Sequence, residues 1–170
     1  MALLSIVLPS YNEEQNIANT SKVLSELLEQ EKIEYELVFV SDGSKDATYE
    51  EILKAAEKNP RIKGAKFSRN FGKEACIFAG LRLTTGDAVI VMDCDLQHPP
   101  ELLTEMIENW QQGFDVVYMT ADPNDPVLQN KYQHIKGRFI GEGNKAFAKL
   151  NFLFALANLY LADRRFGLSV

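Results

Sequence analysis

Two aspartates, Asp93 and Asp95, stand one residue apart directly after the apolar run 89–92. A buried strand cannot carry two carboxylates at this spacing unless it has reached the edge of its sheet. Residues two apart on an extended chain point the same way, so Gln97 adds a third oxygen donor. Oxygen donors suit Mg²⁺ or Mn²⁺, and the segment predicts a metal site made by Asp93, Asp95 and Gln97. The alternative is a cap for the following helix, with Asp95 as the capping residue.

Three other polar clusters also follow apolar segments. The first contains Tyr11, which can stack on a base, and Glu13, which can bond a nucleoside. In the second, Asp42 can accept hydrogen bonds from a base or a ribose, and the glycine after it permits close ligand approach. In the third, Arg69 and Lys73 supply positive charge that suits an anionic diphosphate. The first two clusters alone are also compatible with an ordinary turn and helix cap, and the third with a solvated basic loop.

The elements that must position these clusters alternate between strand and helix patterns. This alternation predicts an α/β fold with a mostly parallel sheet covered on both faces. Ligands of such sheets bind outside the carboxyl ends of the strands, where all four clusters fall, so the sequence predicts one binding cleft. The expected strands are 3–8, 35–40, 62–67, 88–92 and 114–119, and the expected helices are 12–30, 46–59, 73–83 and 101–111.

The bulk composition narrows the function classes. A length of 170 residues allows one domain with a real core. The net charge of −6 argues against nucleic acid as a partner, since nucleic-acid binders usually carry a basic surplus. Cys76 and Cys94 lie in apolar segments without metal-type spacing, which favours a reducing, cytoplasmic compartment. No apolar stretch is long enough to span a bilayer.

Four motifs in order resemble family 2 glycosyltransferases. They are Leu8-Pro9-Ser10-Tyr11-Asn12-Glu13-Glu14, the segment Val40 to Thr48, the segment Arg69 to Ala75, and Met92 to Glu101. The resemblance is greatest to the polyprenyl-phosphate branch, relatives of dolichol-phosphate mannose synthase and bactoprenol glucosyltransferase. It implies the GT-A fold, a Rossmann-like sheet flanked by helices, and an inverting enzyme that uses a nucleotide diphosphate sugar with Mg²⁺ or Mn²⁺.

The resemblance also implies a role for each matching residue. Metal and diphosphate would be held by Asp93, Asp95 and Gln97, the first two being the expected catalytic residues. Cys94 would line the pocket where the family usually has alanine. The nucleoside would be held by Pro9, Tyr11, Glu13, Val40 and Asp42, and the phosphates would lie near Arg69 and Lys73.

The last fifty residues depart from the family pattern. We expect residues 1–119 to form a nucleotide-sugar-binding GT-A domain, and residues 120–170 a shortened, helical acceptor-side segment rather than an independent domain. The apolar stretch Leu150 to Leu161, with Lys and Arg in 145–165, could lie peripherally on the cytoplasmic face of a membrane. The alternative is a core helix or the interface of a homo-oligomer.

These observations predict a hexosyltransferase that acts from a nucleotide diphosphate sugar, of the UDP-glucose or GDP-mannose type, onto a polyprenyl phosphate. The shortened acceptor half motivates an alternative, a nucleotide-sugar-binding module without transferase activity. A phosphatase of the D-x-D type is weaker, because that motif normally sits on the first strand. A dinucleotide oxidoreductase is weaker still, because no G-x-G-x-x-G follows any strand.

Overall fold

The computed structural model describes residues 2–96, 100–114, 116–121, 132–137 and 160–163. The strands are β1 (Leu3–Ser10), β2 (Glu34–Ser41), β3 (Ile62–Lys66), β4 (Ala88–Val91), β5 (Val116–Ala121), β6 (Tyr132–Gly137) and β7 (Tyr160–Asp163). The helices are α1 (Ile17–Gln30), α2 (Thr48–Lys58), α3 (Lys73–Leu83) and α4 (Glu101–Gln111). The expected α/β fold is confirmed, and the elements up to β5 lie close to their predicted ranges.

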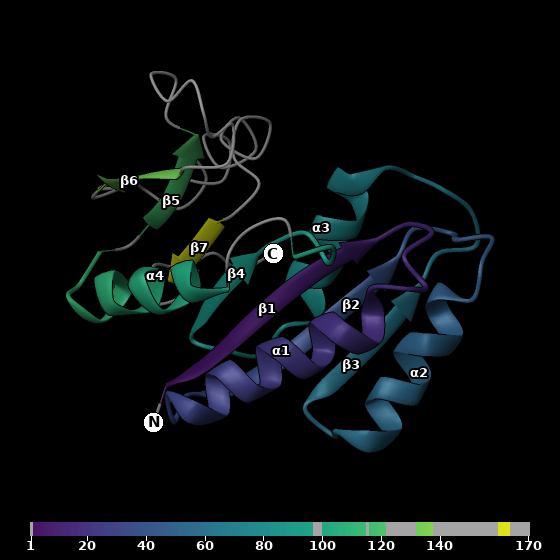
Figure 1. The fold of residues 1–170 in the computed structure, drawn as a ribbon. Coiled ribbons are helices and arrows are strands. Elements are labelled where there is room, and N and C mark those ends of the chain that lie inside the picture. The colour runs from purple at the N-terminus through teal and green to yellow at the C-terminus, as the bar shows by residue number, and fades with distance from the viewer. Residues whose placement is uncertain (1, 97–99, 115, 122–131, 138–159, 164–170) are drawn as a thin grey trace.

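All described strands belong to one sheet in the order β3-β2-β1-β4-β7-β5-β6 (Figure 1). β1 pairs in parallel with both β2 and β4, and β2 pairs in parallel with β3. The chain therefore builds outward from β1 to β3 and then returns to the other side of β1 at β4. This reversal creates a topological switch point between the carboxyl ends of β1 and β4, which is where open α/β sheets bind ligands.

The expectation of a helical tail is wrong for residues 132–137, which form β6 antiparallel to β5, and for residues 160–163. The latter form β7, which lies antiparallel between β4 and β5, with Ile90 opposite Leu161 on one side and Val117 opposite Leu161 on the other. An inserted strand satisfies the backbone hydrogen bonds of two neighbours at once, which a helix cannot do. The rest of the predicted 150–161 helix and most of the 145–165 membrane segment lie outside the described residues.

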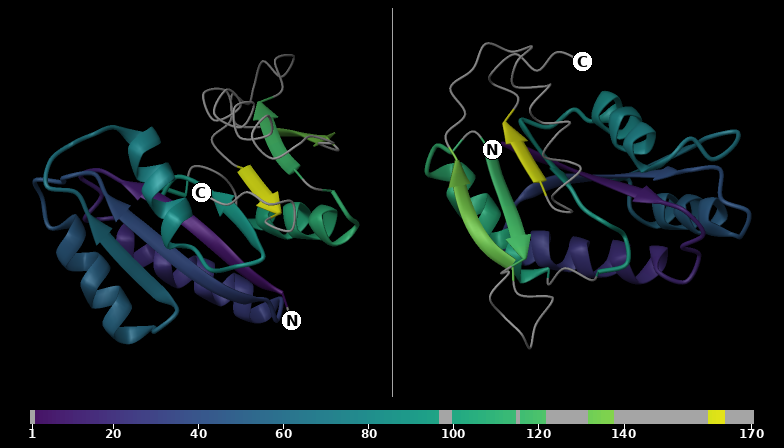
Figure 2. Two further views of the ribbon diagram at one scale, coloured as in Figure 1. Left: turned by 180° about the vertical axis from the view of Figure 1, so that it is seen from behind. Right: turned by 90° about the horizontal axis from the view of Figure 1, so that it is seen from above.

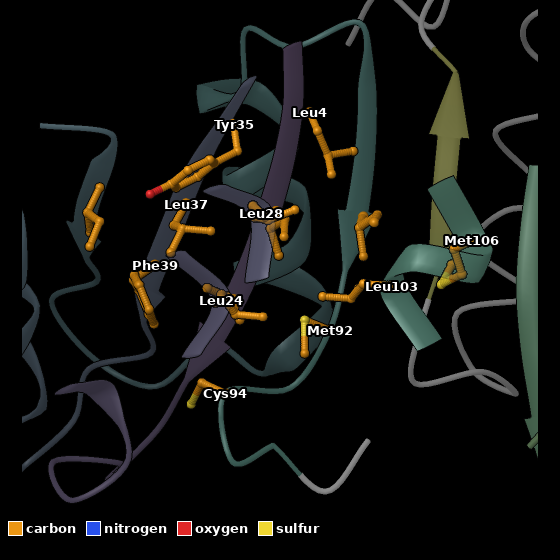
Figure 3. Close-up of a cluster of buried hydrophobic side chains, with 14 of the residues drawn as sticks. Leu4, Leu24, Leu28, Tyr35, Leu37, Phe39, Met92, Cys94, Leu103 and Met106 are labelled. Atoms are coloured by element: carbon orange, nitrogen blue, oxygen red, sulfur yellow. The ribbon is translucent and has the colours of Figure 1, made fainter. Parts of the chain in front are cut away.

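Two hydrophobic layers cover the sheet, because successive side chains of β1 and β2 point to opposite faces. On one face, Leu37 and Phe39 join a cluster with α1, α2 and α4, in which Leu24, Leu28 and Met106 are fully buried (Figure 3). On the other face, Val38 and Val40 pack against α3. Figure 2 shows α1 and α2 on one side of the sheet and α3 on the other.

A buried carboxylate ties α3 to the amino end of the sheet. Glu36 of β2 is only 4% exposed, and it accepts hydrogen bonds from the Ser5 hydroxyl and from both the backbone and side chain of Thr85. The Lys63 ammonium completes the set as an ion pair. Burial acts to raise the pKa of Glu36, but the hydrogen bonds from Lys63, Ser5 and Thr85 outweigh it and leave the pKa lowered.

This network predicts a pH-dependent contribution to stability. Because the folded-state pKa of Glu36 lies below its ordinary value of 4.5, its contribution is present above pH 4.5 and is lost as the pH falls through the folded pKa. Glu36→Gln should lower the free energy of unfolding at neutral pH by about 1–3 kcal/mol and flatten its decline in acid. Chemical denaturation at several pH values measures both effects.

A matched control is available on the same strand. Glu34 pairs with Arg61 across 3.7 Å, and both side chains are about half exposed. Glu34→Gln should change the free energy of unfolding by no more than about 0.5 kcal/mol. An equal loss in the two variants, or an unchanged acid profile in Glu36→Gln, would contradict the assignment of this stability to the buried network.

Candidate donor-sugar and metal site

A pocket of about 370 Å³ opens at the carboxyl ends of β1, β2 and β4. It lies at the switch point of the sheet, beside the amino-terminal end of α3, and Figure 3 shows Cys94 at the end of the core cluster just beyond Met92. The lining residues are Pro9, Ser10, Tyr11, Glu13, Asp42, Asn70, Gly72, Lys73, Cys76, Asp93, Cys94 and Asp95. Loops that are far apart in the sequence therefore meet in one concave surface, and most of the residues that line it are polar or charged.

The loops after β1 and β2 hold each other in place. The backbone N–H of Asn12 donates to the Ser44 hydroxyl at 3.1 Å, and the Asn12 side chain accepts from the backbone N–H of Lys45 at 3.0 Å. The backbone N–H of Glu13 donates to the Thr48 hydroxyl at 2.7 Å. These bonds fix where Tyr11 and Glu13 stand on the pocket wall. Tyr11 is 42% exposed, so its ring remains accessible to a ligand.

Asp42 shapes the pocket through the loop that follows β3. One carboxylate oxygen accepts the backbone N–H of Phe71 at 2.7 Å, and the other accepts that of Gly72 at 2.9 Å. Asp42 is 4% exposed, and the Cys76 thiol also hydrogen-bonds to it. The residue expected to hold a nucleoside is thus also the residue that positions the start of α3.

Gly43 makes this close approach of two loops feasible. Its φ of +63° lies in the left-handed region, which side chains rarely adopt. A Cβ at this position would lie 2.3 Å from the backbone carbonyl carbon of Arg69 and 2.6 Å from the backbone nitrogen of Asn70. Glycine is therefore required for two separate reasons, backbone conformation and space.

Lys73 and Asp93 form an ion pair across the pocket, with Nζ 2.5 Å from Oδ1. The Lys73 side chain is 45% exposed and that of Asp93 is 26% exposed. Lys73 is the first residue of α3, and Asp93 follows β4 by two residues. The pair thus links the loop between β3 and α3 to the loop after β4. These loops meet beside the switch point of the sheet, where there is room for a ligand.

The two pocket cysteines are protonated thiols. Burial raises the pKa of Cys94 to about 12. The hydrogen bond with Ser10 acts to lower this pKa, whereas the negative charges of Glu13, Asp95 and Asp93 act to raise it further. Burial likewise raises the pKa of Cys76 to about 12, with a further contribution from Asp42. A thiol with this pKa is not a nucleophile at neutral pH, so both cysteines form part of the pocket wall.

Asp93 and Asp95 are the donors that fit a hard divalent cation, since both are carboxylates on the pocket wall. Within the described part of the chain, no three His, Cys, Asp or Glu side chains are grouped so that they could hold a metal ion by themselves. This donor set matches Mg²⁺ or Mn²⁺, which keep several waters and take further ligands from substrate phosphates. Gln97 lies outside the described residues.

The pocket brings together most of the predicted site residues. They are Pro9, Tyr11, Glu13, Asp42, Lys73, Asp93, Cys94 and Asp95. Val40 does not line the pocket, because its side chain is fully buried under α3. Arg69 also lies off the pocket wall, with its guanidinium 4.3 Å from the centre of the Phe71 ring.

Four lining residues were not singled out by the sequence. Ser10, Asn70 and Gly72 lie between predicted site residues in the same loops. Cys76 is the least expected, because it belongs to a helix and its segment reads as apolar. Its spacing provides a signal, since residues three apart on a helix share a face and Lys73 precedes Cys76 by three.

The family model for glycosyl transferase family 2 matches residues 5–163 of this chain. The chain belongs to this family. Its resemblance to the polyprenyl-phosphate branch is supported by the bactoprenol glucosyl transferase of Shigella phage SfX, which is 48% identical over 114 residues. Those residues make up 67% of this chain and 37% of the relative.

A second similar protein is the uncharacterized glycosyltransferase sll0501 of Synechocystis sp., 47% identical over 117 residues. The match covers 69% of this chain and 37% of that protein. The chain thus spans little more than a third of the length of these relatives. No helix in the part of the chain that the structure describes is both long and apolar enough to cross a membrane.

Solved structures share the GT-A fold of this family member. A mannosyltransferase from Pyrobaculum calidifontis, solved with GDP-Man and Mn²⁺, superposes with a TM-score of 0.60 at 18% identity and covers 95% of this chain and 44% of its own. The mannosyl-3-phosphoglycerate synthase of Rubrobacter xylanophilus gives a TM-score of 0.66 at 20% identity, covering 96% of this chain and 54% of its own. At these identities the likeness concerns the fold alone.

Proposed function

We propose that this protein is an inverting hexosyltransferase that transfers a sugar from a nucleotide diphosphate donor to a polyprenyl phosphate. The observation that carries the proposal is the convergence of Asp93, Asp95, Asp42 and Tyr11 in one pocket at the switch point of the sheet. Family membership and the similarity to a bactoprenol glucosyl transferase support the choice of a lipid phosphate acceptor.

The donor would occupy the pocket as follows. The Tyr11 ring, exposed at the pocket, would stack on the base, and Glu13 and Asp42 would accept hydrogen bonds from the nucleoside. Asp93 and Asp95, with Gln97, would hold Mg²⁺ or Mn²⁺ beside the diphosphate. When bound, the cation offsets the charge that builds on the nucleoside diphosphate leaving group.

Transfer would be a single displacement. An oxygen of the acceptor phosphate attacks the anomeric carbon, the bond from that carbon to the diphosphate breaks, and the nucleoside diphosphate departs with the electron pair. The acceptor phosphate is already ionised at neutral pH, so the reaction needs little help from a general base. The pocket residues therefore act by orienting the donor and stabilising charge.

A thermal-shift panel tests the proposal directly. We expect Mn²⁺ together with either UDP-glucose or GDP-mannose to raise the unfolding midpoint, while Mn²⁺ or the donor alone has a much smaller effect. A panel with no metal-dependent shift would refute the proposed donor site. Transfer of radiolabelled sugar to a butanol-extractable lipid then tests the acceptor. Metal-dependent donor binding without labelled lipid would instead favour a nucleotide-sugar-binding module.

We also propose the division of the chain into residues 1–119 for the donor and residues 120–170 for the acceptor side. Among the residues that the structure describes, those that line the pocket all come from the first of these segments. A lipid phosphate acceptor would bring the protein to a membrane surface, where peripheral contact through 145–165 remains part of the proposal.

A further inference from the structure

The charge of the pocket is opposite to what a diphosphate requires. Four carboxylates line it, those of Glu13, Asp42, Asp93 and Asp95, against one ammonium from Lys73 among the described residues. A nucleotide diphosphate is itself an anion, so this wall repels it unless cationic charge enters with it. The existing ammonium is moreover engaged, because it contacts Asp93 at 2.5 Å.

The position of Lys73 at the start of α3 does not stabilise the helix. The amino terminus of a helix carries partial positive charge, which disfavours a cation in the first turn. Lys73 is the first residue of α3 and follows Gly72, which has a φ of +98°. The favourable interaction that the structure gives the Lys73 ammonium is the ion pair with Asp93.

Asp93 cannot give the same oxygen to Lys73 and to a divalent cation without competition. Oδ1 is the atom that Lys73 contacts, and Asp93 is the first carboxylate of the expected metal pair. The Lys73 side chain is 45% exposed and its stem is long and flexible, so the ammonium can leave Asp93 without disturbing the core.

We propose that Lys73 is an exchangeable counter-cation of this site. In the free protein it neutralises Asp93, and on loading it yields Asp93 to the divalent cation and moves to the diphosphate. Metal and nucleotide therefore bind cooperatively. The cation reduces the repulsion between the carboxylates and the diphosphate, and the diphosphate provides a new partner for the Lys73 ammonium that the cation displaces from Asp93. The inference rests on the proposed function and assigns Lys73 as a positioning residue of the donor site.

The test measures Mn²⁺ binding to the free protein by electron paramagnetic resonance and UDP or GDP binding by calorimetry. Lys73→Met should bind Mn²⁺ alone about fivefold more tightly than the wild type, because Asp93 no longer has an internal partner. The same variant should bind UDP or GDP at saturating Mn²⁺ about tenfold more weakly, because a charge-assisted contact to the phosphates is lost. A merely structural role would not move these two affinities in opposite directions.

Two control variants test whether the effect depends on the charge of residue 73 and on its position in the pocket. Lys73→Arg retains the charge and should keep the Mn²⁺ affinity of the wild type. Lys54 pairs with Glu51 on α2 at 2.6 Å, away from the pocket, so Lys54→Met removes an ammonium from a carboxylate without changing either affinity. The unfolding midpoint of each variant, measured by thermal denaturation, shows that it is folded.

The proposal is overturned if Lys73→Met binds Mn²⁺ alone no more tightly than the wild type, or if its nucleotide affinity is unchanged. The first result would mean that Lys73 does not compete for Asp93, and the second that it never reaches the diphosphate. Failure of the proposed function looks different, because then wild-type protein itself shows no Mn²⁺-dependent binding of UDP or GDP.

Discussion

Replacing Asp95 with alanine is expected to abolish the Mn²⁺-dependent binding of the donor, with a loss in affinity of at least about a hundredfold. Partners of metal ligands already cost ten- to a hundredfold when they are removed, and a direct ligand should cost more. Asp95 lies on the pocket wall with Asp93, and these two carboxylates are the expected cation donors that the structure describes. Calorimetry with UDP-glucose and GDP-mannose, with and without Mn²⁺, measures the change.

Two further variants show whether the charge of Asp95 or the size of its side chain matters, and whether the loss of any carboxylate has the same effect. Asp95→Asn keeps the size of the side chain but removes the charge, and it should lose most of the affinity. Glu57 is an exposed carboxylate on α2, and Glu57→Ala should bind the donor like the wild type. Equal donor affinity in Asp95→Ala and the wild type would disprove the metal site at this position.

Gly43→Ala should destabilise the fold by about 2–4 kcal/mol, the second large effect that the structure predicts. The alanine would be strained at a left-handed φ of +63°, and its Cβ would clash with the backbone of Arg69 and Asn70. Since backbone atoms cannot rotate away, the loops after β2 and β3 must separate. The hydrogen bonds from Phe71 and Gly72 to Asp42 would then be strained, so donor binding should fall with stability.

Gly113 provides the matched control for this prediction. Its φ is +95°, but a Cβ there would meet nothing within 4 Å. Gly113→Ala should therefore cost only the backbone strain, about 1–2 kcal/mol, and leave donor binding unchanged. Chemical denaturation gives both values, and the difference between them measures the clash. Equal losses in the free energy of unfolding would show that the predicted clash at Gly43 does not destabilise the fold.

The strands and helices up to β5 were accessible from sequence because their signals are local. Buried parallel strands read as short apolar runs, and α2, α3 and α4 each end within three residues of a glycine or proline. The observed bounds of α3 and α4 equal the predicted ones. The first residues of α1 were predicted too early, because the segment after Tyr11 forms a bonded turn in which Asn12 has a φ of +56°.

The strand β7 could not be predicted in the same way. A short apolar run fits a buried strand and a helix equally well when only its periodicity is considered. Tyr160–Asp163 becomes a strand because β4 and β5 both offer it unpaired backbone groups, and that opportunity exists only after the sheet has formed. Its partners are more than forty residues away in the chain.

Which loops would line the pocket could be predicted from sequence, because carboxylates after apolar strands must come to the edge of a parallel sheet. How those side chains are paired and buried depends on the folded chain. The tertiary structure placed Val40 beneath α3 and Arg69 over Phe71, and it paired Asp93 with Lys73. The physical reason is that strand ends follow from local pattern and burial. The partner of a charged side chain depends instead on distances between segments that only the folded sheet brings together.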